Sequence, residues 1–185
     1  RSERAEAAGA VNTIIVLDDG RLRGDNTDGV GLVRDLRNNH GFDFAGKRVL
    51  LLGAGGAARG VLGSLVDAGP STLTIANRTA AKALELAQAV GTEQVDGCGL
   101  DDLEGRAFEL IVNATSSGLD GAVPPLPDGL LAADGWVYDM VYGDAPTPFC
   151  RWGRAQGAGR ALDGLGMLVE QAAESFRLWR GVRPQ

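Results

Sequence analysis

A glycine-rich turn between an apolar strand and a helix is the segment whose residue types best suit ligand chemistry. Gly53, Gly55 and Ala58 follow the apolar run 49–52 in the pattern G-x-G-x-x-A. Such a turn lets the backbone approach a pyrophosphate, and the free N–H groups of the helix start supply donors. The alternative is a turn that binds nothing. The pattern predicts a dinucleotide site with contacts from Gly53, Ala54, Gly55, Gly56 and Ala57.

The end of the following strand favours NADP over NAD. An NAD site usually places an acid about 20 residues beyond the glycine turn, where it bonds the ribose 2′-hydroxyl. Here the chain reads Asn77-Arg78-Thr79, with Lys82 close behind and no acid at that corner. A guanidinium forks onto phosphate and an ammonium adds charge, so we expect Arg78 and Lys82 to bind a 2′-phosphate. The alternative is that both are solvated surface charges.

Alternating strands and helices must position these residues. Strands are predicted at 49–52, 72–76, 110–113 and 136–141, a short one near 94–95, and helices after Gly55 and over 80–90. This alternation predicts an α/β fold, a Rossmann-type doubly wound parallel sheet with helices on both faces and ligands at the carboxyl ends of the strands.

The two ends of the chain carry further predicted elements. The first ten residues look like the end of a helix, and a hairpin over 11–17 and 21–24 leads to a helix that starts near Gly29. A strongly amphipathic helix is predicted over 165–179. Its apolar face gathers Leu165, Leu168, Val169, Ala172, Phe176 and Trp179.

Composition excludes several classes of function. A net charge of −6 argues against nucleic acid as a partner. No apolar run is long enough for a membrane span and no signal peptide is visible, so we expect a cytoplasmic protein. Cys98 and Cys150 lack metal-type spacing and predict no disulfide. His40, the only histidine, is predicted at a helix end or on the surface. No metal site is expected.

Seven short segments, in order, resemble one known family. They are Gly9–Thr13, Gly24–Gly29, Gly53–Ala57, Asn77–Thr79, Asn113–Thr115, Asp139–Tyr142 and Gly166–Ala173. On these motifs, which span almost the whole chain, the sequence resembles shikimate dehydrogenase. The resemblance implies an NADP-dependent reduction of the small molecule 3-dehydroshikimate to shikimate, in the aromatic amino-acid pathway. A quinate/shikimate dehydrogenase paralogue and a non-catalytic dinucleotide-binding module are the alternatives.

The resemblance also implies a division of the chain into domains. Residues 1–27 match the tail of a substrate-binding domain, 28–163 an NADP-binding Rossmann domain, and 164–185 a helix that returns to the substrate domain. The first residue is Arg1 rather than Met, and the family's serine-rich substrate motif is not found. We therefore expect a preceding portion, in a protein that is a monomer or a homodimer.

Asp28 matches the catalytic aspartate of the family, which works with a lysine at the substrate hydroxyl. From the residues alone Asp28 equally well caps a helix, where its ionised form would be favoured. Neither Lys47 nor Lys82 matches the family's lysine. We therefore expect this chain alone to bind NADP(H) weakly or not at all, and not to turn over.

The remaining site residues also follow from the resemblance. Asn12, Tyr142 and Gln171 match substrate contacts. From the sequence alone, Asn12 would be a polar strand residue, Tyr142 a half-buried aromatic at a strand end, and Gln171 a solvated residue on the flank of its helix. Met140, Gly164 and Met167 match the wall of the nicotinamide pocket, although both methionines also suit a core. At the end of the fourth strand, Thr115 and Ser116 suit the cofactor crevice.

Overall fold

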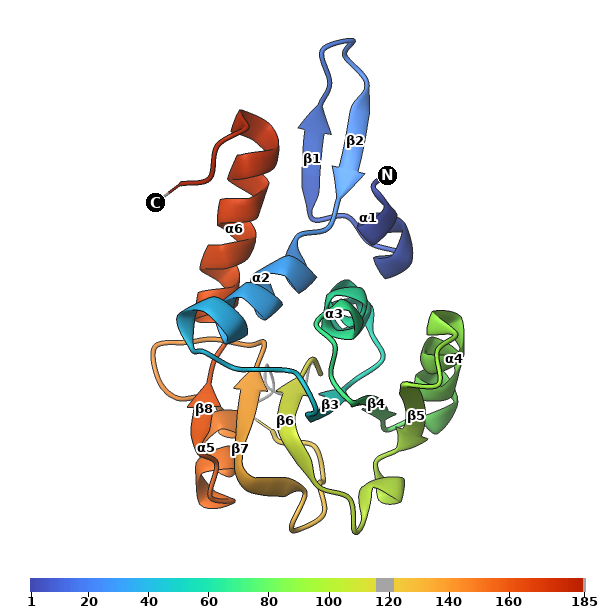
Figure 1. The fold of residues 1–185 in the computed structure, drawn as a ribbon, viewed down its shortest axis with the longest axis vertical. Helices are drawn as coiled ribbons and strands as arrows, with labels where there is room; N and C mark the ends of the chain where they lie inside the picture. The colour runs from blue at the N-terminus through green and yellow to red at the C-terminus, as the bar shows by residue number, and fades with distance from the viewer. Residues whose placement is uncertain (116–121, 185) are drawn as a thin grey trace.

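The computed structural model describes residues 1–115 and 122–184 (Figure 1). Its centre is a sheet of six parallel strands in the order β5-β4-β3-β6-β7-β8. The strands are β3 (Arg48–Leu52), β4 (Thr72–Asn77), β5 (Val95–Gly99), β6 (Phe108–Asn113), β7 (Leu131–Asp139) and β8 (Arg160–Leu162). The predicted Rossmann-type parallel sheet is confirmed.

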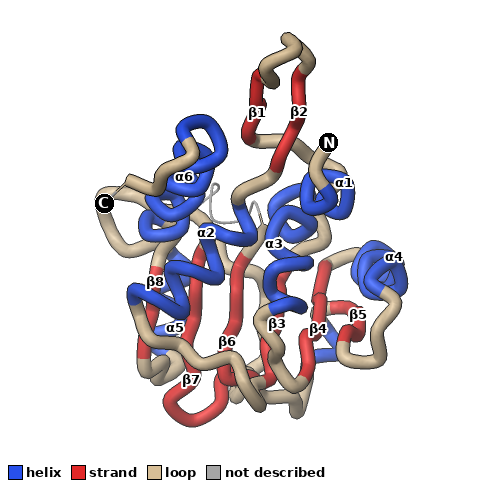
Figure 2. The backbone as a smooth tube through the Cα atoms, turned by 45° about the horizontal axis from the view of Figure 1, so that its top comes forward, coloured by secondary structure: helices blue, strands red, loops and turns tan. Residues whose placement is uncertain are grey.

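Helices cover both faces of this sheet (Figure 2). They are α1 (Glu3–Ala8), α2 (Asp28–Arg34), the π-helical turn η1 (Asp35–Asn39), α3 (Gly56–Asp67), α4 (Ala80–Val90), the 3-10 turn η2 (Asp101–Leu103), α5 (Pro148–Ala155) and α6 (Leu165–Arg180). One buried cluster joins α2, α3, α4 and α6 to the sheet through residues such as Leu36, Leu65 and Met167. A second cluster, which includes Phe149 of α5, fills the other face.

A two-stranded antiparallel hairpin, β1 (Thr13–Val16) and β2 (Leu22–Asp25), stands apart from the main sheet beside α6 (Figure 1). Both strands are close to the predicted segments, but β1 begins two residues later than expected. Asn12 donates its backbone N–H to the Asp25 carbonyl, and its side chain lies among the loops that follow the hairpin. Through its backbone bond to Asp25 and its side-chain bond to Asp28, Asn12 therefore connects the hairpin to the start of α2.

The last helix forms close to the predicted range, but the face that it packs against α2 is polar rather than apolar. On α6 the apolar residues Val169, Phe176 and Trp179 are 60%, 40% and 54% exposed. The polar side chains of Glu170, Glu174 and Ser175 are buried. The helix approaches α2 so closely that a Cβ on Gly31 would lie 2.8 Å from the Met167 carbonyl oxygen. This close approach, which periodicity cannot reveal, turns the polar face inward.

Two elements near the carboxyl end were not expected, α5 and β8. The start of α5 carries a local signal, because Thr147 caps the helix through Cys150 N–H and Pro148 occupies its first turn. The predicted strand 136–141 begins earlier, at Leu131. Its pairing with β6 changes register between Phe108 and Leu110. Cys98 and Cys150 are buried free thiols. No helix in the described ranges is long and apolar enough to cross a membrane.

Candidate functional site

The predicted site residues meet at one edge of the sheet because parallel strands in register end together. Leu52 pairs with Ala76 of β4 and Asn113 of β6, and Asn113 pairs with Asp139 of β7. The segments that follow these strands therefore form one continuous edge. This is where doubly wound folds bind nucleotides.

The glycine turn has the geometry of a phosphate cradle. Gly53 has φ +107°, and a Cβ there would lie 3.0 Å from the Ala114 carbonyl oxygen, so only glycine suits the position. Gly55 caps α3 without a side chain, and a Cβ on Gly55 or Gly56 would meet nothing within 4 Å. Within the described residues no side chain caps this twelve-residue helix, so its first N–H groups remain available to a ligand. Ala58 is fully buried, as close strand–helix packing requires.

The corner after β4 carries two exposed cations. Asn77 donates its side-chain amide to the Thr79 carbonyl oxygen over 3.0 Å, which closes the turn before α4. Arg78 and Lys82 are exposed, and neither pairs with a carboxylate in residues 1–115 or 122–184. Both remain available for an anion at this corner.

A buried hydrogen-bond cluster joins the ends of β6 and β7. Asn113 donates to Asp139 Oδ1 over 3.0 Å and accepts from the Thr115 hydroxyl over 2.7 Å. Asp139 is fully buried, and burial raises its pKa above the ordinary value. Sequence reasoning missed Asn113 and Asp139 as individual site residues, although a polar residue at the end of a buried strand was the available signal. Ser116 lies outside the described residues.

The residues expected around a nicotinamide come together at the start of α6. A Cβ on Gly164 would overlap the carbonyl oxygen of Met140, so the two segments are in direct backbone contact. Met167 is buried behind them in the core. Tyr142, by contrast, is 50% exposed, and the structure does not join it to the other expected substrate contacts.

Asp28 lies between the hairpin and α3. Its Oδ1 accepts a 2.7 Å hydrogen bond from the Asn12 amide, and a Cβ on Gly60 of α3 would lie 3.0 Å from its Oδ2. Asn12 is itself fixed, because its Oδ1 accepts from Thr27 N–H over 3.0 Å. The chain thus places an expected substrate contact, the expected catalytic carboxylate and α3 side by side.

Two readings of Asp28 from the sequence need correction. The side chain does not cap α2, and Asn26 Oδ1 instead accepts the Asp28 N–H over 3.1 Å. Nor is the ionised form favoured beyond the ordinary level. Burial raises the pKa of Asp28, and the Asn12 hydrogen bond offsets this only in part. A carboxylate whose pKa rises toward neutrality suits proton exchange.

Gln171 lies on the inner side of α6 rather than on a solvated flank. Its side chain is half-buried, and its Oε1 is buried with no hydrogen-bond partner among the described residues. One helical turn later, Ser175 contacts the Thr13 hydroxyl at 2.7 Å. A polar amide left unpaired next to the hairpin suits a hydrogen bond to a ligand.

A charge network that sequence reasoning missed fixes α6 against α1 and α2. Glu174 accepts from Arg34 over 2.7 Å and from Arg177 over 2.7 Å, and lies 3.3 Å from Arg4. Arg177 and then Arg34 lower the pKa of Glu174 to about 2. Arg4 also pairs with buried Asp25 over 2.5 Å. The Glu174–Arg177 pair is local, but no local sequence signal could reveal the contacts of Glu174 with Arg4 and Arg34, which lie far away in the chain.

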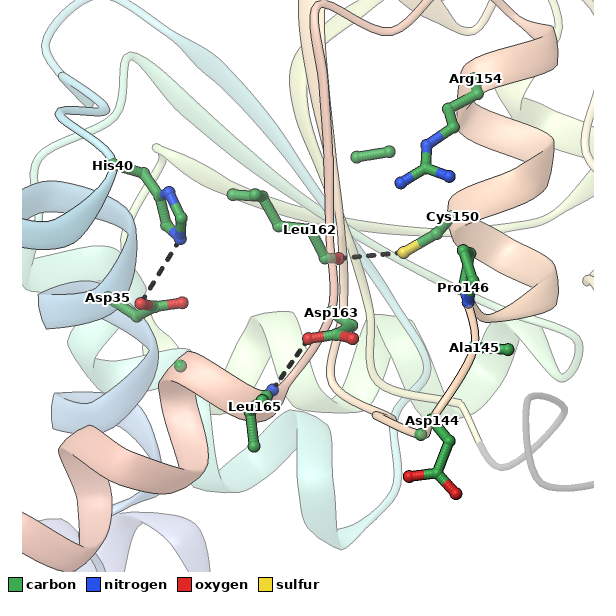
Figure 3. Close-up of a pocket in the computed structure, with 13 residues that line it drawn as sticks. Asp35, His40, Asp144, Ala145, Pro146, Cys150, Arg154, Leu162, Asp163 and Leu165 are labelled. Carbon is green, nitrogen blue, oxygen red and sulfur yellow. Dashed lines mark hydrogen bonds and ion pairs between the residues drawn. The ribbon is translucent and has the colours of Figure 1, made fainter.

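A cavity of about 510 Å³ lies next to η1, α5 and β8, and Asp163 and Leu165, the neighbours of Gly164, also line it (Figure 3). His40 and Asp35 lie on one side of it, with the imidazole Nε2 3.6 Å from the Asp35 carboxylate. Arg154 and Cys150 lie on the other. His40 follows η1 directly, which confirms its predicted place at a helix end. In the described ranges no group of histidine, cysteine and acidic residues could hold a metal ion.

Comparison with known proteins agrees with this geometry. The family described as "Shikimate / quinate 5-dehydrogenase" matches residues 35–119, and "Shikimate 5'-dehydrogenase C-terminal domain" matches 164–185. A curated shikimate dehydrogenase (NADP(+)) of Thioalkalivibrio sulfidiphilus is 60% identical over 100% of this chain and 68% of its own length. The chain belongs to the shikimate dehydrogenase family.

Solved structures extend the similarity to the whole fold. A shikimate 5-dehydrogenase of Thermus thermophilus, crystallised with NADP(H) and shikimate, is 37% identical with a TM-score of 0.83. The match covers 100% of this chain and 67% of the length of the Thermus thermophilus chain. An Ael1 enzyme of Pseudomonas putida is 48% identical with a TM-score of 0.92, over 100% and 68%. The chain thus spans about two thirds of the length of these relatives.

Proposed function

We propose that residues 1–185 supply the NADP(H) site and part of the substrate site of a shikimate dehydrogenase. The reaction would interconvert 3-dehydroshikimate plus NADPH and a proton with shikimate plus NADP⁺. The observation that carries this proposal is the placement of Asp28 against both Asn12 and the nucleotide-binding helix. A module that only bound a dinucleotide would have no use for this polar pair.

The cofactor site suits NADP(H) at both of its ends. The glycine turn begins α3 without a side-chain cap in the described ranges, so helix N–H groups are available to a pyrophosphate. Arg78 and Lys82 are exposed, form no ion pair within the described residues, and would bind a 2′-phosphate. Thr115 lies beside Gly53, with its methyl group 3.4 Å from a Cβ built there. Met140, Gly164 and Met167 would form the wall at the nicotinamide. Bound there, NADP(H) supplies or accepts the hydride.

Asp28 has the surroundings needed to help move the accompanying proton. Its carboxylate is oriented by Asn12 and partly desolvated by α3, and its pKa is raised. We propose that it bonds the reacting hydroxyl and shares its proton with a lysine. Lys47 precedes β3 at the opposite edge of the sheet and Lys82 lies in α4, so that lysine must come from elsewhere in the protein. Gln171, with its unpaired Oε1, and Tyr142 would hold other substrate hydroxyls.

Two exposed apolar surfaces support the expected domain division. Ile14, Val16 and Leu22 of the hairpin are 58%, 71% and 68% exposed, and Phe176 and Trp179 lie on nearby α6. Surfaces of this kind usually pack against another element. We propose that residues 1–27 and 164–185 belong to the substrate domain, and 28–163 to the cofactor domain. The buried free thiols Cys98 and Cys150 suit the cytoplasmic location that we propose.

The decisive experiment follows NADP⁺ reduction at 340 nm by the full-length gene product. Shikimate is the test substrate, and quinate and NAD⁺ are the controls. Turnover with the pair shikimate and NADP⁺, and with no other pair, would support the proposal. Turnover with quinate or with NAD⁺ would indicate the quinate/shikimate dehydrogenase paralogue. Failure with every pair would favour a non-catalytic dinucleotide-binding module.

Arg78→Ala tests the cofactor assignment in the same assay. Loss of a charge-assisted hydrogen bond costs roughly 1.5–3 kcal/mol, so the KM for NADPH should rise about 10-fold or more. The KM for NADH, which lacks the 2′-phosphate, should change little. Equal losses for both cofactors would remove Arg78 from the 2′-phosphate site.

A further inference from the structure

The helix that carries Met167 and Gln171 begins without a side-chain cap of its own. Its N-cap residue is Gly164, and a side chain there would overlap the Met140 carbonyl oxygen. The close contact between α6 and the end of β7 thus excludes the usual Ser, Thr, Asp or Asn. The first N–H groups of α6 must therefore find acceptors elsewhere.

Two side chains outside the helix provide those acceptors. Asp163 Oδ1 accepts Leu165 N–H over 3.1 Å, and the Tyr138 hydroxyl accepts Met167 N–H over 3.2 Å (Figure 3 shows the first). Tyr138 is fully buried in β7, directly before Asp139 and Met140. A strand residue therefore caps the helix that packs on it.

The Tyr138 hydroxyl is oriented by a buried carboxylate from a third element. It donates to Asp35 Oδ2 over 2.7 Å, and Asp35 is only 1% exposed. Asn39 holds the other oxygen over 2.9 Å. Burial and the neighbouring Asp35 raise the pKa of Tyr138, so the phenol keeps the proton that it donates. Asp35 also opens the π-helical turn η1, an irregularity often found at functional sites.

Asp35 lies directly against the first turn of α6. A Cβ on Gly166 would overlap its carboxylate, so nothing separates the two segments. The hydrogen-bond chain Asp35–Tyr138–Met167 consequently joins η1, β7 and α6 at one point. Residues on both sides of this point, Met140 and Met167, are those expected at the nicotinamide.

We infer that Asp35 and Tyr138 are positioning residues that set the nicotinamide wall by fixing the first turn of α6 against the end of β7. The inference rests on the proposed function, which places Met140, Gly164 and Met167 at the nicotinamide. It adds two residues that would not touch the cofactor. A wall that is not held in place must be ordered when the nicotinamide binds, so its loss of order would weaken binding of the nicotinamide half specifically.

Tyr138→Phe removes the hydroxyl alone and is the sharpest test. The full-length protein is titrated with NADP⁺ and with 2′,5′-ADP, which keeps the adenosine half and its 2′-phosphate but lacks nicotinamide. The affinity for NADP⁺ should fall about 3- to 10-fold while that for 2′,5′-ADP stays unchanged. Asp35→Asn, which keeps one acceptor for the phenol, should change the same ratio by less and covers the case in which Tyr138→Phe does not fold.

Thr74→Val is the matched control. Thr74 is a buried hydroxyl of β4 that bonds Asp96 and Arg106, each over 2.6 Å, and does not contact α6. Its loss should lower stability yet leave the ratio of the two affinities unchanged. The inference is overturned if Tyr138→Phe lowers both affinities equally or neither. If the unmodified protein binds neither compound, the proposed function itself fails.

Discussion

Two carboxylates near the contact between α2 and α6 have opposite surroundings. Glu174 is 1% exposed and is surrounded by Arg4, Arg34 and Arg177, which hold its pKa near 2. Asp28 is half-buried, accepts a hydrogen bond from the Asn12 amide, and has a raised pKa. Glu174 is stabilised as an anion by the fold, whereas Asp28 is left poorly compensated. Such an uncompensated group suits chemistry better than structure.

The contrast also separates stability from activity. Removing the charge of Glu174 should damage the fold, because three guanidinium groups converge on it. Removing the charge of Asp28 should relieve a desolvation penalty and leave the fold intact. Active sites commonly carry such locally unfavourable groups.

The largest expected effect is that of Asp28→Asn on turnover by the full-length enzyme. We expect kcat to fall about 100-fold or more, because an amide cannot exchange the proton. The affinity for NADPH should be kept, and the melting temperature should stay equal or rise. Initial rates measure the loss of kcat, and thermal unfolding measures the melting temperature. An unchanged kcat would reduce Asp28 to a structural residue and end the comparison.

Glu174→Gln should give the reverse pattern. We expect the free energy of unfolding to fall by about 2 kcal/mol. This is less than the loss usual for breaking a fully buried ion pair, because the arginine side chains are partly exposed to water. Urea denaturation measures this loss, and kcat should change far less than for Asp28→Asn.

Glu109→Gln is the control for that experiment. Glu109 pairs with Arg48 over 2.6 Å at a site where the arginine is 47% exposed. Its loss should cost less than about 0.5 kcal/mol. Similar losses for both variants would show that the buried network around Glu174 adds nothing beyond a surface ion pair.

The pH dependence of stability sharpens the same contrast. The pKa of Glu174 falls from 4.5 to about 2 on folding, so its contribution is complete above pH 4.5 and is lost as the pH falls toward 2. The difference in unfolding free energy between the unmodified protein and Glu174→Gln should shrink by about 1 kcal/mol between pH 7 and pH 3.5. Asp28 has the opposite sign, because a raised pKa favours the folded state as the pH falls. A difference that is constant with pH would contradict the assigned role of Glu174.

The smallest expected effect comes from Asn12→Ala. Without the amide donor, the pKa of Asp28 should rise further, because the Asn12 hydrogen bond lowers it. The acidic limb of the kcat/KM profile should then move to higher pH, with a loss of about 3-fold on that limb. If kcat/KM fell by the same factor at every pH, the result would indicate that Asn12 contacts substrate and does not affect the pKa of Asp28.

The parts of the fold predicted best from the sequence are those written in consecutive residues. The glycine turn needs φ +107° at Gly53 and a small residue at Ala58, and both requirements are local. The same holds for the apolar runs that became β3, β4 and β6. The corner at Asn77, Arg78 and Thr79 likewise follows from the absence of an acid at a fixed distance from the turn.

By itself the sequence determined the parallel sheet, the glycine turn and the two exposed cations at the end of the next strand, because local backbone geometry and short-range spacing carry that information. Only the tertiary structure decided which face of α6 turns inward, how Glu174 meets Arg4, and how Tyr138 caps a helix 29 residues later in the chain. It also reversed the expected effect on Asp28, since burial by α3 outweighs a helix N-terminus. These contacts join residues far apart in the chain, and their energies depend on burial, which no local pattern encodes.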